Sequence, residues 1–260
     1  MFEPLKSYIS FLLASTNLHG VHSPFAYDLV SECFYDDNSK LKPKYDKLKN
    51  YRQSLLDNNR LINVTDFGAG SRIFKSNHRK ISAIAKNAGI SNKRAELLIR
   101  IVQYFNSKNI LEIGTSLGIG TACLSLGNPK SKITTLEGCP ETAKIAKEQF
   151  NKFHLNNIDI KIGDFKSTLP KDINKMNYDL IYFDGNHQKE ATINYFEQCL
   201  MSVHNNTVFI FDDIHWSKGM EEAWNYIKDH NKVTVSIDTF QWGMVFFRKE
   251  QPKEHFIIRV

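Results

Sequence analysis

The chain has 260 residues, 42% hydrophobic and 24% charged, which suits one globular α/β domain with an N-terminal elaboration. It contains no run of roughly 18 apolar residues and no basic start followed by an apolar stretch, so we expect a cytoplasmic protein without a membrane segment. The net charge of +6 is compatible with an anionic partner, but the lysines and arginines are spread along the chain, which favours a solvated basic surface.

The first part of the chain, to about residue 105, predicts helices broken by loops, the last of them an amphipathic helix over 95–105. It contains no repeat, linker or low-complexity tract. We therefore predict that residues 1–90 form a helical cap and lid on one larger domain of residues 91–260.

From residue 109 onward, short apolar runs alternate with longer amphipathic segments, which predicts a parallel sheet flanked by helices. Residues 233–237 and 242–248 are rich in β-formers and lie close together, as in a hairpin. We expect an α/β fold whose sheet is doubly wound, mostly parallel, seven-stranded and Rossmann-like, and ends in an antiparallel hairpin. The candidate strands are 109–113, 133–136, 158–162, 180–183 and 208–211, and the candidate helices are 140–153, 188–203 and 218–230.

The first strand ends in a glycine-rich turn with Gly114, Gly118 and Gly120, which leads into a helix. Glycines let the backbone pass close beneath a ligand without a Cβ clash. The next strand ends at Glu137, about 20 to 25 residues beyond the glycines, where a doubly wound sheet holds the two hydroxyls of a ribose with a carboxylate. The turn and the acid together indicate a cofactor site.

The third strand runs into Gly163-Asp164-Phe165 at the same edge of the sheet. Asp164 is the candidate partner of an adenine amino group, and Phe165 is the candidate packing residue beside it. A dinucleotide-binding dehydrogenase also uses a glycine turn and a distal acid. However, the glycine spacing here does not reproduce G-x-G-x-x-G, and no Walker pattern occurs.

These three strand ends resemble the class I methyltransferases, and more narrowly the small O-methyltransferases similar to the catechol, caffeoyl-coenzyme A and antibiotic-sugar enzymes. The resemblance covers about residues 91–248, makes 91–260 a methyltransferase domain and implies S-adenosylmethionine as cofactor. A sulfonium cofactor has no pyrophosphate, so a looser glycine turn suffices. The cofactor-binding residues that we expect are Glu112, Gly114, Thr115, Ser116, Gly118, Gly120, Glu137, Gly138, Asp164, Phe165 and Asp184.

Two acidic clusters end the fourth and fifth strands and are expected to face one crevice. The resemblance implies that Asp184, Asp212 and Asp213 bind a divalent cation such as Mg²⁺, which prefers oxygen ligands. Such an ion would hold a substrate oxygen near the methyl sulfonium and lower the pKa of that hydroxyl. The alternative is that Asp212 or Asp213 only caps the following helix and that Asp184 only bonds a loop.

His187 stands where the catechol-like relatives carry a catalytic lysine, and a histidine titrates near neutral pH. We therefore expect His187 and Asp184 as the catalytic residues, with His187 taking the hydroxyl proton. This departure from the family pattern leaves the identity of the base open. His215 and Trp216 are expected to contact substrate or to pack against neighbouring residues.

Two further segments have an unusual composition. Residues 66–71 form a second glycine-rich segment, but a basic, polar stretch follows it instead of a helix and an acid-ended strand, so we interpret it as a mobile lid or a tight turn. Residues 19–25 place two histidines beside a proline turn; the alternatives are that they approach an active site, that they bind a metal, or that the segment is a structural turn. No Cys-x-x-Cys pair occurs, which argues against a zinc knuckle; the four cysteines are Cys33, Cys123, Cys139 and Cys199.

The sequence predicts an enzyme that methylates a hydroxyl of a small molecule, as a monomer or a homodimer. Two alternatives remain. An RNA methyltransferase is favoured only by the positive charge, for which Lys93, Arg94 and the lysines of 40–49 form a diffuse candidate surface. A non-catalytic protein that retains the cofactor fold would bind the cofactor without turnover.

Overall fold

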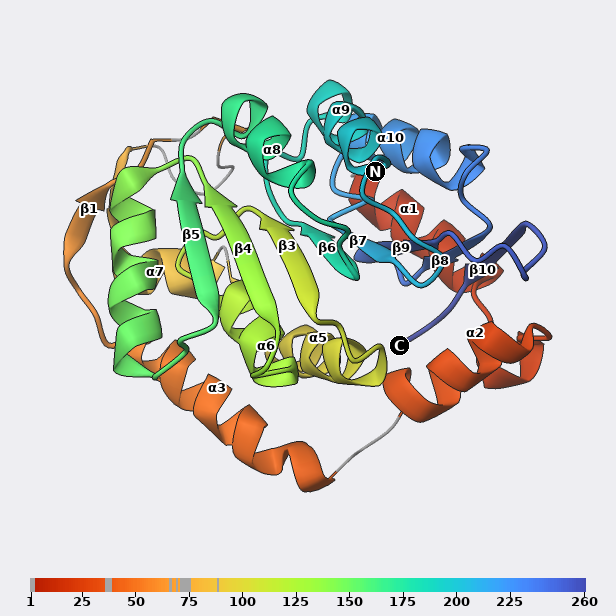
Figure 1. Cartoon of the computed structure of the whole chain (residues 1–260), viewed down its shortest axis with the longest axis horizontal. Helices are drawn as coiled ribbons and strands as arrows, with labels where there is room; N and C mark the ends of the chain where they lie inside the picture. Colours follow the sequence, from red (N-terminus) through yellow and green to blue (C-terminus); the bar gives the residue numbers. More distant parts are fainter. Residues whose placement is uncertain (1–2, 36–38, 66, 69, 71–75, 88) are drawn as a thin grey trace. The chain divides into compact units, whose positions relative to one another are not determined.

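The computed structural model describes residues 3–35, 39–65, 67–68, 70, 76–87 and 89–260. By its internal contacts the chain divides into two compact units. We call Asp37–Lys171 the glycine-turn unit, and Met1–Asp36 together with Asp172–Val260 the terminal unit. Figure 1 follows both along the chain by colour.

The glycine-turn unit contains three parallel strands in the order β3-β4-β5, which lie side by side in Figure 1. Nearly every residue of β3 and β4 is buried, as expected of parallel strands that are covered on both faces. The strands are β3 (Asn109–Ile113), β4 (Lys132–Glu137) and β5 (Ile158–Ile162), and the helices are α3 (Lys42–Leu56), α4 (Ile81–Asn87), α5 (Asn92–Tyr104), α6 (Ile119–Gly127) and α7 (Pro140–Lys152).

The helices of this unit begin at local sequence signals. The Ser91 hydroxyl accepts the N–H of Arg94 and so caps α5, and Pro140 opens α7 with Glu141 beside it. A short antiparallel pair, β1 (Leu61–Asn63) with β2 (His78–Lys80), precedes these helices. The prediction of helices and loops alone was therefore wrong for these residues; each strand has only three, too few for an alternating pattern to show.

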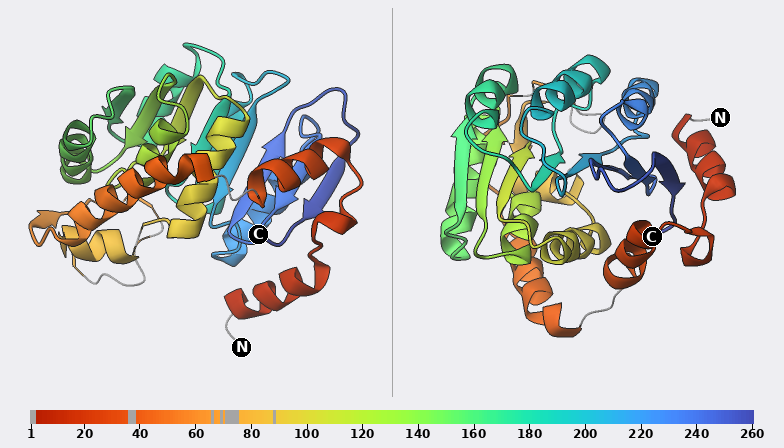
Figure 2. Two further views of the ribbon diagram at one scale, coloured as in Figure 1. Left: turned by 90° about the horizontal axis from the view of Figure 1, so that it is seen from below. Right: turned by 45° about the vertical axis from the view of Figure 1, so that its right-hand side comes forward.

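The terminal unit carries strands in the order β10-β8-β9-β7-β6. Strands β6 and β7 are parallel, β9 is antiparallel to β7 and β8, and β10 is parallel to β8. Figure 2 shows the red N-terminal helices in the same part of the molecule as the blue C-terminal strands. The elements are α1 (Glu3–Ala14), α2 (Pro24–Leu29), β6 (Leu180–Phe183), α9 (Lys189–Cys199), β7 (Val208–Asp212), α10 (Lys218–Asp229), β8 (Val235–Asp238), β9 (Trp242–Phe246) and β10 (Glu254–Ile257).

The fold class is confirmed: the chain is a mixed α/β protein with a mostly parallel main sheet and an antiparallel pair, β8 and β9, near its end. The main sheet has eight strands rather than the expected seven, because β10 adds to its edge. Helix α8 (Phe165–Ile173), which spans the boundary between the units, was not predicted either. It contains Pro170, which masks its helical pattern.

The N-terminal residues divide between the two units, since α1 and α2 belong to the terminal unit and α3, α4 and α5 to the glycine-turn unit. The division into a cap over 1–90 and a domain over 91–260 stays a prediction. Across the described residues, every helix is too short or too polar to cross a membrane.

Gly118, immediately before α6, supports a stability prediction. Its φ is +77°, and an added Cβ would lie 2.5 Å from Phe150 Cε1 and 2.7 Å from the Tyr51 hydroxyl. Left-handed strain and overpacking add, so Gly118→Ala should lower the free energy of unfolding by about 3 kcal/mol in chemical denaturation. Gly219→Ala is the matched control: its Cβ would meet nothing nearer than 3.5 Å, so this change within α10 should stabilise by roughly 0.5–1 kcal/mol. Equal effects of the two changes would contradict the argument.

Candidate functional site

The glycine-rich turn after β3 is held against the end of β4. Gly114, Ser116 and Gly118 have left-handed φ values of 110°, 49° and 77°. The N–H groups of Gly114 and Thr115 both donate to the carbonyl oxygen of Leu136, at 3.0 and 3.2 Å. Ser116 holds this conformation although it has a Cβ, which is a local strain of the kind that recurs at binding sites.

Glu137, the last residue of β4, joins two turns. Its Oε2 accepts the N–H of Ser116 at 2.6 Å, and its Oε1 accepts the N–H of Cys139 at 2.8 Å. Burial raises the pKa of this carboxyl, while the backbone donors of Cys139 and Ser116 act to lower it. The residue is 9% exposed, at the end of β4 beside the glycine-rich turn.

Glu112 lies beneath the turn rather than on it. Its side chain is fully buried, and Oε2 accepts hydroxyl hydrogen bonds from Thr121 and Thr135. Its Oε1 has no partner among the described residues. Burial raises its pKa from the ordinary 4.5 to about 7, against the two threonine hydrogen bonds and with a smaller contribution from the charge of Glu137. These contacts tie the end of β3 to α6 and β4, and a role of Glu112 in cofactor binding stays a prediction.

The other predicted cofactor residues of this unit follow the same edge. Gly120 lies in the first turn of α6, and Gly138 has the ring of Phe67 close against it. The N–H of Gly163 donates to the backbone oxygen of Glu137, which fixes the end of β5. Asp164 is exposed, and its Oδ1 accepts the N–H of Lys166 at 3.0 Å at the start of α8; Phe165 is half-buried.

In the terminal unit, the turn after β6 carries Asp184 and His187. The two side chains are about a quarter exposed, with Nε2 of His187 3.8 Å from Oδ1 of Asp184. Asn186 and His187 have left-handed φ values of 72° and 33°, and the amide of Asn186 donates to the hydroxyl of Tyr195 at 3.2 Å. This turn therefore holds a histidine and a carboxylate together on strained backbone.

Asp212, the last residue of β7, and Asp213, the residue after it, make different contacts. Asp212 is buried; its Oδ1 accepts the N–H of Asp213 at 3.0 Å, and the Tyr182 hydroxyl lies 3.5 Å from its Oδ2. Asp213 has a φ of 55°, and its N–H also donates to the carbonyl oxygen of Gln241.

The arrangement fits neither a metal centre nor a simple helix cap. Among the described residues no group of three or more histidine, cysteine or acidic side chains is placed to hold a metal ion, so Asp184, Asp212 and Asp213 are not brought together as a ligand set. The helix after β7, α10, is instead capped by Ser217, whose hydroxyl accepts the N–H of Met220.

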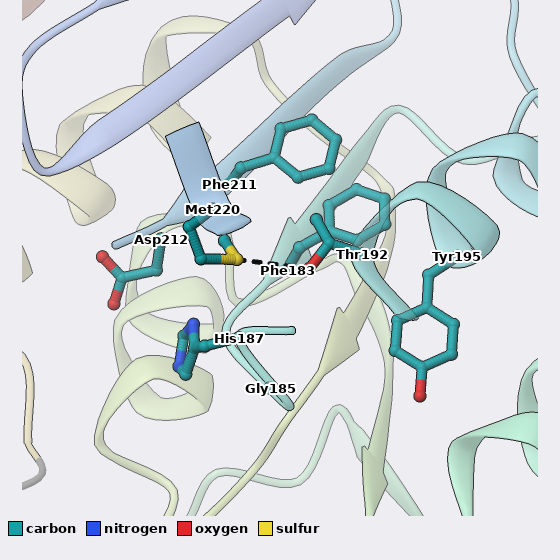
Figure 3. A pocket seen from close by; sticks show the side chains of 8 residues that line it. All are labelled: Phe183, Gly185, His187, Thr192, Tyr195, Phe211, Asp212 and Met220. Atoms are coloured by element: carbon teal, nitrogen blue, oxygen red, sulfur yellow. Dashed lines mark hydrogen bonds between the residues drawn. The ribbon is translucent and has the colours of Figure 1, made fainter. Parts of the chain in front are cut away.

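A small cavity opens beside these strand ends, and Figure 3 shows it from close by. His187 and Asp212 lie on one side of it and Tyr195 on the other. Its wall combines apolar side chains with the polar groups of His187, Thr192, Tyr195 and Asp212. It is lined by Phe183, Gly185, His187, Thr192, Tyr195, Phe211, Asp212 and Met220.

His215 is engaged by two carboxylates, a role that the sequence did not reveal. Its Nδ1 lies 3.1 Å from Glu221 and its Nε2 lies 2.9 Å from Asp238, while its ring stacks on Phe240. Burial lowers the pKa of this imidazole, but the hydrogen bonds and charges of Asp238 and Glu221 outweigh it and raise the pKa overall. Glu221 lies six residues and Asp238 23 residues after His215, and neither separation belongs to a motif that the sequence shows. Trp216 is 36% exposed.

The two unusual segments differ in what the structure describes. Asp66, Ala69 and residues 71–75 lie outside the described residues, so the choice between a lid and a tight turn for 66–71 stays open. In 19–25, Pro24 begins α2, the Ser23 hydroxyl lies 3.3 Å from the side-chain oxygen of Gln251, and Phe25 packs edge-on against Phe246. These contacts are those of a structural turn.

The lysines considered for RNA binding include one with a local role. Lys44 donates to the side chain of Gln103 and to the carbonyl oxygen of Gly127, at the end of α6. Lys49 lies 3.9 Å from Asp46 in an exposed ion pair. Part of the basic charge on α3 is thus paired within the unit.

Comparison with known proteins decides the family. A family model described as O-methyltransferase matches residues 74–240, which is more than half of the chain. The chain belongs to the O-methyltransferase family. A relative is the catechol O-methyltransferase of Niastella koreensis, 26% identical over 129 residues; the match covers 48% of this chain and 58% of that protein.

Solved structures support the fold of this O-methyltransferase family member. An O-methyltransferase from Bacillus cereus, solved in complex with SAH, superimposes with a TM-score of 0.56 at 19% identity and covers 92% of this chain and 100% of its own. An SAH-bound methyltransferase from Podospora anserina gives a TM-score of 0.59 at 14% identity, over 88% of this chain and 97% of its own. At these identities the likeness concerns the fold alone.

The buried carboxyl of Glu112 makes a pH dependence of stability testable in this member of the O-methyltransferase family. A pKa raised to about 7 means that the folded chain holds this proton more tightly than the unfolded chain does. The resulting stability is fully present below about pH 4.5 and is lost as the pH rises through 7. At 1.36 kcal/mol per pKa unit, the change is on the order of 3 kcal/mol.

Glu112→Gln should remove this dependence, because the amide oxygen can still accept from Thr121 and Thr135 but carries no charge. Unfolding free energies should therefore be measured from pH 4.5 to 8.5. The free energy of unfolding of Glu112→Gln should increase relative to that of the wild type as the pH rises. Glu141→Gln, which changes an exposed glutamate of α7, is the matched control. Parallel curves for Glu112→Gln and the wild type would contradict the assignment.

Proposed function

We propose that this protein transfers a methyl group from S-adenosylmethionine to a hydroxyl of a small molecule. The observation that carries the proposal is the Glu137 carboxylate, which is buried at a strand end and bonded to the N–H groups of Ser116 and Cys139 beside the left-handed glycine turn. Membership of the O-methyltransferase family and the SAH complexes of proteins with this fold support it.

In this proposal the glycine-turn unit binds the cofactor. Glu137 accepts hydrogen bonds from the ribose hydroxyls, and the residues from Gly114 to Gly120 line the path of the methionine part. Asp164 and Phe165 border the adenine. Glu112 holds the turn from beneath through Thr121 and Thr135. When bound, the cofactor supplies an electrophilic methyl on a sulfonium.

The terminal unit supplies the proton acceptor. Nε2 of His187 lies 3.8 Å from Oδ1 of Asp184, and the ring lines the cavity, so we propose that Nε2 of His187 takes the hydroxyl proton with the Asp184 carboxylate beside the ring. Tyr195 and Asp212 of the same cavity are donors and acceptors for orienting an acceptor molecule. Catalysis then consists of positioning and proton removal.

Proton removal by His187 requires no metal ion in this proposal. Asp212 is occupied by Asp213 and Tyr182, and the three acids do not form a ligand set among the described residues. The Mg²⁺ dependence implied by the resemblance stays a prediction, which chelation tests. The cytoplasmic location and the homodimer also stay predictions.

One prediction of this proposal concerns cofactor affinity. Glu137→Ala removes the acceptor of two ribose hydroxyls and should weaken S-adenosylhomocysteine binding on the order of 100-fold in calorimetry, since a hydrogen bond to a charged group contributes about 1.5–3 kcal/mol. Because Ser116 and Cys139 lose their acceptor as well, a thermal melt should confirm that the variant is folded at the temperature of the titration. Asp159→Ala, an exposed acid of β5 paired with Lys161, is the control. Unchanged affinity in Glu137→Ala would remove the ribose assignment.

Another prediction distinguishes proton removal by His187 from catalysis that depends on a metal ion. His187→Gln should lower kcat about 100- to 10,000-fold without changing cofactor affinity, and wild-type turnover should survive EDTA. His78→Gln, an exposed histidine of β2, should keep full activity. Loss of turnover in EDTA, restored by Mg²⁺, would instead support the metal centre of Asp184, Asp212 and Asp213.

The acceptor class is tested by formation of S-adenosylhomocysteine with catechol, with a simple sugar and with an RNA transcript. Turnover with a small hydroxyl compound supports the proposal, and turnover with RNA alone would support the RNA alternative. Cofactor binding without turnover on any of a broad metabolite panel would indicate a non-catalytic binding protein.

A further inference from the structure

The side chain of Phe67, in the second glycine-rich segment, lies against Gly138, the residue after Glu137. A Cβ added at Gly138 would be 2.8 Å from Cδ2 and 3.3 Å from Cε2 of Phe67. Gly138 is not among the glycines with positive φ, so its backbone conformation does not demand a glycine. The nearby Phe67 ring is what favours a glycine at this position, because a larger residue would have to displace the ring.

The chain leading to Phe67 is anchored at the same turn. The N–H of Thr65 donates to Sγ of Cys139 at 3.3 Å, and Sγ of Cys139 lies 3.8 Å from the carbonyl oxygen of Asn63. Cys139 is buried, and its own N–H donates to Glu137. The residue that helps to hold the proposed ribose carboxylate therefore also holds the segment that delivers the Phe67 ring.

The ring is available to a ligand. Phe67 is 53% exposed, and it borders Gly138, the residue next to Glu137. An exposed aromatic face beside a carboxylate that accepts ribose hydroxyls offers apolar cover for the flat base or the sugar of a nucleoside. Glu137 provides the polar contact, and Phe67 provides the apolar one.

We propose that Phe67 is a cofactor-binding residue, whose ring covers the adenosine part of S-adenosylmethionine at the Glu137–Gly138 turn. This inference rests on the proposed function, and it gives residues before the first main-sheet strand a part in cofactor binding. The contact with Gly138 sets where the ring stands. The homocysteine part of the ligand is not involved.

The test is a calorimetric double-mutant cycle with S-adenosylhomocysteine, repeated with adenosine. Phe67→Ala should weaken both ligands about tenfold, whereas Leu61→Ala, a 63% exposed residue of β1 in the same segment, should leave affinity unchanged. Phe67→Tyr should restore most of the affinity, because it keeps the ring. Thermal melts of each variant separate lost binding from lost folding.

Gly138→Ala completes the cycle. In the wild-type background its methyl group meets the ring and should weaken binding, but in Phe67→Ala the obstacle is gone, so the two changes should be strongly non-additive. If the wild type binds S-adenosylhomocysteine and Phe67→Ala binds it equally well, the inference is wrong while the proposed function stands. If the wild type binds neither ligand, the proposed function itself fails.

Discussion

The glycine-turn unit depends on the hydrogen bonds of one residue, Glu137. Its carboxylate accepts the N–H groups of Ser116 and Cys139, and its backbone oxygen accepts the N–H of Gly163. The ends of β3, β4 and β5 are thereby fixed to one point. Burying a carboxylate is unfavourable unless hydrogen-bond donors surround it, and burying an N–H group is unfavourable without an acceptor. The carboxylate and the N–H groups therefore satisfy one another's hydrogen bonds. The binding surface follows from this mutual satisfaction.

The terminal unit also has strained backbone at its strand ends. Asn186, His187 and Asp213 hold left-handed backbone although none is a glycine. Each such residue costs on the order of 1–3 kcal/mol and persists only where other contacts fix it. Here the amide of Asn186 bonds Tyr195, and the N–H of Asp213 bonds Gln241. A turn held in this way keeps the imidazole of His187 at the cavity rather than letting it follow the strand direction.

Much of the fold could be predicted because buried parallel strands leave continuous apolar runs in the sequence. Strands β3, β5 and β6 begin and end where the pattern predicts, and β7 is longer by one residue. The pattern fails where elements are short or interrupted: β1 and β2 have three residues each, β10 lies at the sheet edge, and α8 contains Pro170. The cavity was only partly foreseeable, since Thr192 and Met220 come from helices whose relative packing no motif encodes.

The roles of acids at strand ends show most clearly what sequence alone lacks. Glu112, one residue before the end of β3, and Glu137, the last residue of β4, both lie near the glycine turn, and both were expected to touch the cofactor. Burial raises the pKa of Glu137 as well, but two backbone N–H donors act to lower it and so stabilise its charged form. Glu112 has only two threonine hydroxyls and complete burial, so its pKa rises to about 7 and it serves the turn from within. Since donors reach these acids from residues 9 to 23 positions away or from their own turn, their environment, and with it their function, is decided only when the chain folds.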